Sequence, residues 1–163
     1  MLLHEAPVGS RLGWLGRRRL NRAVDALREA LEIEPDNWPT LWALGKVYQR
    51  LGCAEEALES LRIACELNPT HPDVAREAGL AALAAGDGPE AIRLCKAARS
   101  ASPEDAGLTA NLALAYLING EVERASSTAH EAVERDPGDA VSQRVLARVE
   151  DVRAGGRPAP QRV

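Results

Sequence analysis

Three cysteines and one glycine-rich run are the residues of this chain whose types and spacing could support catalysis or metal binding. The cysteines are Cys53, Cys65 and Cys95, an odd number with no CxxC spacing and no histidine near enough in sequence to complete a zinc set. The Gly-Asp-Gly-Pro run at 86–89 lacks the preceding strand and the Lys-Ser/Thr pair of a phosphate-binding loop. The sequence therefore predicts reduced thiols, a turn between two helices at 86–89, no bound metal and no cofactor.

The histidines offer no catalytic arrangement either. His4, His71 and His130 fall at the N-terminus, in an expected loop and on an expected helix surface. Neither the G-x-S-x-G motif of hydrolases nor the H-E-x-x-H motif of zinc proteases occurs in the sequence. We therefore expect a protein that is not an enzyme and whose function depends on a binding surface.

The elements that carry these residues are expected to be helices. Of the 163 residues, 29 are Ala and 21 are Leu, against 19 Val, Ile and Thr, and only 3% are aromatic. Ala and Leu are strong helix formers, whereas a β-sandwich or barrel needs β-branched and aromatic residues. No apolar run approaches the roughly 18 residues that span a bilayer, and the first residues lack the features of a signal peptide. The composition predicts an all-helical, cytoplasmic protein.

Charge is distributed unevenly along the chain. Residues 1–22 carry a net charge of +4, residues 23–152 of −11 and residues 153–163 of +3. The basic N-terminal part, with three consecutive arginines at 17–19, is either simply solvated or contacts an acidic partner, an anionic membrane or the acidic body. Nucleic acid is not an expected partner, because the body is acidic and the basic ends lack interleaved aromatic residues.

A period of 34 residues runs through most of the chain and decides the expected architecture. Prolines recur at 35, 69, 103 and 137, and alanines at 23, 57, 91 and 125. The same interval links alanines at 30, 64, 98 and 132, glycines at 52, 86 and 120, and small residues at 45, 79, 113 and 147. Coincident series at one interval indicate an array of repeated structural units.

Each unit is expected to form two helices. In the unit 38–71 the first helix covers roughly 39–51 and ends at Gly52, because glycine readily takes the left-handed conformation that ends a helix. The second covers about 54–67 and ends before Pro69, since the residue before a proline avoids the helical region. Small residues at Gly45, Ala57 and Ala64 let the two helices approach closely, and larger side chains there would overpack.

This period and pattern resemble the tetratricopeptide repeat family. The unit 38–71 matches the family's pattern most fully, at Leu41, Leu44, Gly45, Tyr48, Ala57, Leu61, Ala64 and Pro69. The units 72–105 and 106–139 are eroded toward alanine but stay in phase without insertion. The resemblance covers about residues 19–153 and implies an all-α, right-handed superhelical array of helix-turn-helix repeats.

The expected domain organisation has three full repeats between two incomplete ends. Residues 1–18 are expected to be irregular or a degenerate helix, because they contain one proline and three glycines. Residues 19–37 form a partial repeat with one helix near 19–34, and the full repeats are 38–71, 72–105 and 106–139. A helix over 140–153 caps the array, and 154–163 is a flexible tail. The apolar residues near 12–15 either cover the first repeat or bind a partner.

The resemblance implies that the first helix of each repeat lines a concave groove for a peptide or partner helix. The residues projected into this groove are Trp42, Lys46, Gln49, Arg76, Leu80, Leu83, Ala110, Leu114, Leu117, Ile118 and Arg144. The family's carboxylate clamp for chaperone tails is not expected here. Of the positions that would carry it, only Lys46 has a suitable charge, and Glu77 would repel a carboxylate. The leucines either form an open strip for an apolar or amphipathic segment or pack on neighbouring first helices.

Three functions remain open at this point. The leading hypothesis is a non-catalytic adaptor or assembly subunit that holds a partner peptide or amphipathic helix in the concave groove. A second is a small secretion-type chaperone that sequesters apolar segments. A third is a peripheral subunit of a membrane complex that uses the basic N-terminal segment. All three predict a protein or peptide as the partner.

Overall fold

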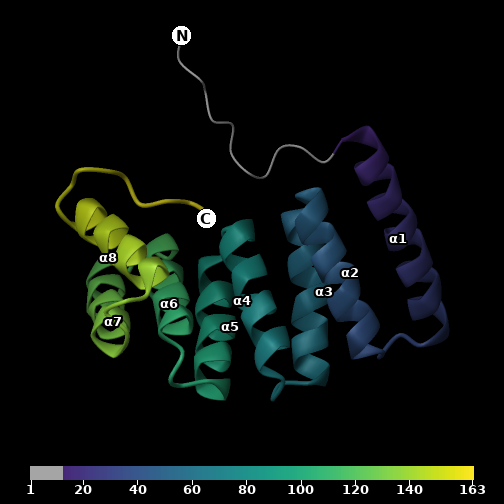
Figure 1. Cartoon of the computed structure of the whole chain (residues 1–163), viewed down its shortest axis with the longest axis horizontal. Coiled ribbons are helices and arrows are strands. Elements are labelled where there is room, and N and C mark those ends of the chain that lie inside the picture. Colours follow the sequence, from purple (N-terminus) through teal and green to yellow (C-terminus); the bar gives the residue numbers. More distant parts are fainter. Residues whose placement is uncertain (1–12) are drawn as a thin grey trace, which may run out of the picture.

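The computed structural model describes residues 13–163, and these form eight helices packed in sequential pairs (Figure 1). The helices are α1 Trp14–Ile33, α2 Trp38–Leu51, α3 Ala54–Leu67, α4 Pro72–Ala85, α5 Gly88–Ala101, α6 Ala106–Ile118, α7 Val122–Arg135 and α8 Ala140–Arg153. No strand occurs in the described range. The prediction of an all-α array with one leading helix, three pairs and one closing helix is confirmed. The predictions for residues 1–12 concern a part of the chain outside the described residues.

Helix ends follow the turn chemistry of the repeat. The first helices of the second and third repeats, α4 and α6, begin after His71 and Asp105, and the Asp105 carboxylate accepts the Leu108 backbone N–H at 3.2 Å. Gly52 and Gly86 adopt positive φ of 77° directly after α2 and α4, where L side chains are strained. The 34-residue spacing of glycines therefore sets where each pair of helices turns.

Small residues occupy the helix crossings, as their periodicity predicts. The alanines at 57, 64, 91, 98, 125 and 132 are all buried. A side chain at Gly45 would overlap that of Leu61, which is itself fully buried, so α2 and α3 approach through the missing Cβ. At Gly79 a Cβ would lie 3.1 Å from the Cys95 Sγ. The close approach of each pair thus depends on glycine or alanine at these positions.

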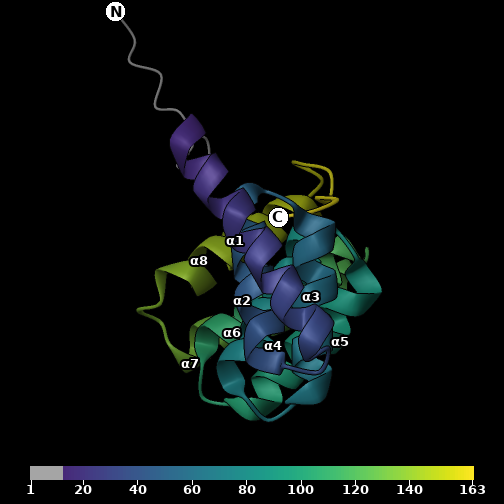
Figure 2. The ribbon, with the colours of Figure 1, turned by 90° about the vertical axis from the view of Figure 1, so that its right-hand side faces the viewer.

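The N-terminal end of the array is open. Helix α1 begins at Trp14, five residues earlier than predicted, and Gly16 lies in its first turn, where a glycine costs little. The guanidinium of Arg17 donates to the Leu51 carbonyl at 3.4 Å and ties this extra turn to the end of α2. Helix α1 packs on α2 but has no preceding helix among the described residues, so Ala30 is exposed where its repeat equivalents are buried. Figure 2 shows the first turns of α1 projecting beyond the array.

The C-terminal end is closed by α8, which packs against both α6 and α7. Residues 154–163 then turn back along the array and reach α4 (Figure 1), where the Val163 N–H donates to the Leu83 carbonyl at 3.1 Å. The sequence predicted a flexible tail here; in the structure this segment is largely exposed, and its far end contacts α4.

Substitution of the two equivalent alanines Ala64 and Ala30 tests this architecture. Ala64 is 0% exposed at the α2–α3 crossing, so Ala64→Leu should lower the free energy of unfolding by roughly 1–3 kcal/mol through overpacking. Ala30→Leu places the same side chain at the same repeat position on the open face of α1 and should change stability by no more than about 0.5 kcal/mol. Urea unfolding measures both, and equal losses would contradict the open N-terminal end.

Candidate binding surface

The first helices α2, α4, α6 and α8 face one side of the array, and they pack more tightly toward the C-terminus. Helix α6 contacts both α4 and α8 directly, whereas α2 and α4 barely touch. Alanines on the facing helices, such as Ala81 and Ala110, are fully or almost fully buried and allow this approach. The side formed by these helices is therefore closed over its C-terminal half and open over its N-terminal half.

This packing corrects the expectation of an exposed apolar strip. Leu83 is 2% exposed, Leu117 is 0% exposed and Leu114 is also buried, so these leucines are core residues. Their burial, together with the contacts between α4 and α6 and between α6 and α8, agrees with the alternative interpretation of the sequence, in which they pack on neighbouring first helices. Leu80 alone among them is substantially exposed, at 38%, and Ile118 is half-buried. A glutamate at Leu83 or Leu117 would bury a carboxylate and destabilise the fold instead of probing binding.

An aromatic cluster lies on the open half. The ring centroid of His71 is 5.2 Å from that of Trp38 and 5.6 Å from that of Trp42, and the two indoles are 6.3 Å apart. The planes are tilted by 32–51°, an ordinary arrangement for packed aromatic rings. Because Trp38 and Trp42 start α2 while His71 precedes α4, the cluster bridges two adjacent repeats.

A lysine lies against this cluster, and an arginine on α4 links that helix to the next first helix. The Lys46 Nζ lies 4.9 Å from the centroid of the Trp42 ring, one helical turn further along α2. The Arg76 guanidinium binds the Asp105 carboxylate at 2.7 Å, which joins α4 to the start of α6. Three buried nitrogens, Trp42 Nε1, His71 Nδ1 and Arg76 Nε, have no hydrogen-bond partner within residues 13–163. The surface thus combines aromatic faces with the positive charge of the exposed Lys46.

Sequence reasoning found part of this surface and missed part of it. Trp42, Lys46 and Arg76 were projected onto it, but Trp38 and His71 were not, because they fall outside the groove positions of a single helix. The sequence signal that could have identified these two residues is an aromatic ring at, or directly before, the start of consecutive first helices. Two other projected residues lie apart from the cluster. Gln49 is half-buried in the last turn of α2, and the exposed Arg144 donates from Nε to the Ala140 carbonyl of its own helix at 3.1 Å.

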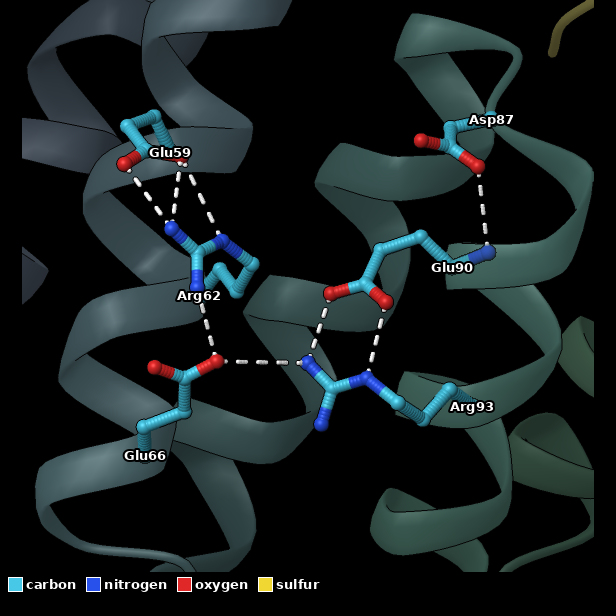
Figure 3. A network of polar contacts seen from close by, with 6 residues as sticks. All are labelled: Glu59, Arg62, Glu66, Asp87, Glu90 and Arg93. Carbon is cyan, nitrogen blue, oxygen red and sulfur yellow. Dashed lines mark hydrogen bonds and ion pairs between the residues drawn. The ribbon is translucent and has the colours of Figure 1, made fainter.

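A hollow of about 760 Å³ lies between the second helices α3 and α5. The charged side chains that line it bind one another. Arg62 bonds both Glu59 and Glu66, and Arg93 bonds Glu90 at 2.6 Å and approaches Glu66 at 3.7 Å (Figure 3). This alternation of carboxylates and guanidiniums links the two helices across the hollow. We interpret it as a structural connection between repeats, since both arginines are already paired.

The same network predicts a pH-dependent contribution to stability. The hydrogen bond from Arg93 holds the pKa of Glu90 below its ordinary value. A lowered folded-state pKa stabilises the protein above the ordinary value, and that contribution disappears as the pH falls through the folded-state pKa. Glu90→Gln should therefore cost up to about 1 kcal/mol at pH 7 and nothing at the acid end.

Urea unfolding of the wild type and the variant at both pH values measures the difference. Glu134→Gln is the matched control, because Glu134 is an exposed helical glutamate with no ion pair in the described part of the chain. A Glu90→Gln effect that is the same at neutral and acid pH would contradict the role of this ion pair.

The thiols are placed for packing. Burial raises the pKa of Cys95 to about 12 and also raises the pKa of Cys65, so neither forms a thiolate readily. All three cysteines are free, and Cys53 is half-buried in the turn after α2. The described residues contain no group of three or more His, Cys, Asp or Glu that could hold a metal ion. None of the eight helices has the length and apolar character needed to cross a membrane.

Comparison with known families identifies the array. One tetratricopeptide repeat family model matches residues 15–72 and a second matches residues 82–149. The chain is a tetratricopeptide repeat protein. The family assignment agrees with the resemblance seen at Leu41–Pro69, and no catalytic family is among the matches.

Solved structures support the same fold. MamA from Desulfovibrio magneticus RS-1 superposes with a TM-score of 0.72 at 24% identity, over 86% of this chain and 79% of that one. YrrB, described as a tetratricopeptide repeat protein with an unusual peptide-binding site, gives 0.70 at 18% identity, over 87% and 73%. The first repeat domain of Spaghetti (RPAP3), bound to the HSP90 peptide SRMEEVD, gives 0.62 at 16% identity, over 72% and 93%. Comparison with curated protein sequences gives no match.

Proposed function

We propose that this tetratricopeptide repeat protein is a non-catalytic adaptor that binds a partner peptide or amphipathic helix on the open half of its concave surface. The observation that carries the proposal is the cluster of Trp38, Trp42 and His71, which bridges two repeats and is flanked by Lys46. Indole and imidazole rings offer large contact area at a small cost in side-chain entropy, and such residues dominate binding energy at interfaces. One structural neighbour is bound to a peptide and another is described as having a peptide-binding site, which supports a peptide as the partner in this proposal.

The chemistry of the cluster favours an extended or helical segment with an apolar side chain and a hydrogen-bond acceptor. An apolar side chain would stack on the indoles, and an acceptor would meet the exposed ammonium of Lys46 beside the Trp42 ring. A chaperone-type carboxylate clamp is disfavoured, because the half-buried Glu77 lies where that clamp would need a cation or amide. Among the other residues projected from the sequence, Gln49, Leu80, Ile118 and Arg144 remain at least partly exposed and are secondary contacts in this proposal. The buried Leu83, Ala110, Leu114 and Leu117 are not contacts.

Trp42 is the residue whose removal should matter most. Trp42→Ala should weaken partner binding by at least about tenfold, as loss of a central aromatic contact does at other interfaces. Lys46→Glu should weaken it less, because the lysine is exposed at the edge of the cluster. Trp14→Ala is the matched control, since Trp14 is 69% exposed and lies at the far end of α1.

The measurement uses the immobilised full chain and its variants to capture partners, followed by titration with synthetic peptides from a captured protein. In a Trp14→Phe background the remaining tryptophans are Trp38 and Trp42, so their fluorescence reports directly on the cluster. Circular dichroism confirms that each variant is folded. Wild-type affinity in a folded Trp42→Ala variant would rule out this surface.

The start of α1 supports a second candidate function, attachment to an anionic membrane surface. Trp14 and Leu15 are exposed at 69% and 65%, and Arg18 and Arg19 are exposed beside them. Tryptophan favours the membrane interface, and basic residues near anionic lipid contribute about 1 kcal/mol each. This arrangement fits a peripheral contact made by the projecting turns of α1.

Liposome flotation tests this candidate with vesicles of phosphatidylcholine alone and with added phosphatidylserine. We expect the full chain to float only with the anionic vesicles, and a Trp14→Ala/Leu15→Ala double variant to remain in the soluble fraction. Absence of the wild-type protein from the floating anionic fraction would exclude membrane attachment through α1.

A further inference from the structure

The C-terminal segment of the chain contacts the array in a way that neither the repeat pattern nor the proposed function explains. After α8, Gly155 takes a positive φ of 76° and the chain reverses direction. The Gly156 N–H donates to the Asp151 carbonyl at 2.9 Å, and Arg157 Nε binds the Asp151 carboxylate at 2.8 Å. These contacts set the direction of the segment as it leaves α8.

The far end of the segment reaches the C-terminal end of α4. There the Val163 N–H donates to the Leu83 carbonyl at 3.1 Å. The Leu83 carbonyl in the last turn of α4 also accepts the Gly86 N–H at 3.3 Å, and a carbonyl oxygen has two lone pairs, so an extended segment can supply a second donor. Pro160 is half-buried along this path, although every other residue of 154–163 is exposed. The contact is therefore local and consists mainly of backbone.

Gly86 makes room for this contact. A Cβ at Gly86 would overlap the Gln161 carbonyl oxygen and lie 3.2 Å from the Arg162 Cβ. Gly52 and Gly120 have nearly the same positive φ after α2 and α6, but nothing lies within 4 Å of a Cβ built on either. Of these three equivalent turns, the α4 turn alone is covered by another segment within residues 13–163.

Charge also favours the contact. The segment 154–163 has two arginines and no acidic residue, whereas residues 23–152 carry a net charge of −11. Arg162 lies next to Gly86 at the C-terminus of α4, where the helix dipole is negative. A basic, proline-containing extended segment is therefore suited to this position.

We infer that the end of α4 around Leu83 and Gly86 is a docking site for an extended peptide, and that the chain's own residues 157–163 occupy it as an intramolecular ligand. The site recognises backbone through the Leu83 carbonyl and excludes side chains at Gly86. An extended segment of similar composition from a partner binds there only when the tail leaves. The inference does not depend on the aromatic cluster of Trp38, Trp42 and His71.

Backbone order in the full chain tests the intramolecular contact. The ¹⁵N relaxation order parameters of Gln161, Arg162 and Val163 should lie near about 0.85 in the wild type, as for rigid backbone. Gly86→Ala should lower them below about 0.6, because its methyl group occupies the place of the Gln161 carbonyl. The control is Gly120→Ala, which imposes the same left-handed strain in open surroundings and should leave the tail ordered.

A second pair of variants releases the tail without altering α4. Val163→Pro removes the N–H that donates to Leu83, whereas Val163→Ala retains it. A synthetic peptide of residues 157–163 should then shift the amide resonances of Gly86 and Asp87 in the Val163→Pro chain. If the tail covers its site nine-tenths of the time or more, the peptide should bind the wild type at least about tenfold more weakly.

Two results would overturn the inference. One is a wild-type tail whose order parameters are already below about 0.6. The other is a peptide that leaves Gly86 and Asp87 unshifted in the Val163→Pro chain at millimolar concentration. Either can occur while Trp42→Ala still abolishes partner binding, so this site and the proposed function can fail separately.

Discussion

The close approach of paired helices through residues without large side chains is the constraint on which this structure depends. The fully buried Leu61 fills the space that a side chain at Gly45 would occupy, and Ala57 and Ala64 are buried on either side of it. In the next repeat the Sγ of Cys95 takes the corresponding place beside Gly79. Every later feature of the array, including the surface that the first helices present, follows from pairs held at this short separation.

The degree of alanine enrichment then decides how open that surface is. Where α4 and α6 carry alanines toward their neighbours, the first helices touch and their leucines become part of the core. Where α2 carries Trp38 and Trp42, the large rings hold the neighbouring first helix away and remain partly accessible. One array therefore contains a closed half that contributes stability and an open half that is available for binding.

The two ends of the array are unequal for a related reason. Helix α1 corresponds to a second helix, and the described residues contain no first helix that would cover it, so positions that are core in later repeats, such as Ala30, are exposed. Helix α8 corresponds to a first helix, no helix follows it within residues 154–163, and its uncovered positions include the polar Gln143 and the small Ala147. The polar end resembles the capping expected of a repeat array, and the apolar first turn of α1 does not.

The sequence by itself determined the architecture, because a 34-residue period of glycine, alanine and proline reports helix ends and crossings that are local in the chain. The bounds of α2 and α3, the burial of Ala57 and Ala64, and the end of α4 at Gly86 could all be predicted in this way, although α5 begins at Gly88, inside the turn predicted for 86–89. Tertiary structure alone decided which groove positions stay open. Exposure of Leu83 and Leu117 depends on the distance between first helices of different repeats, which no single-repeat pattern contains. The meeting of His71 with Trp42, and of the C-terminal tail with Gly86, likewise joins residues that are distant in sequence, so only the folded chain brings them together.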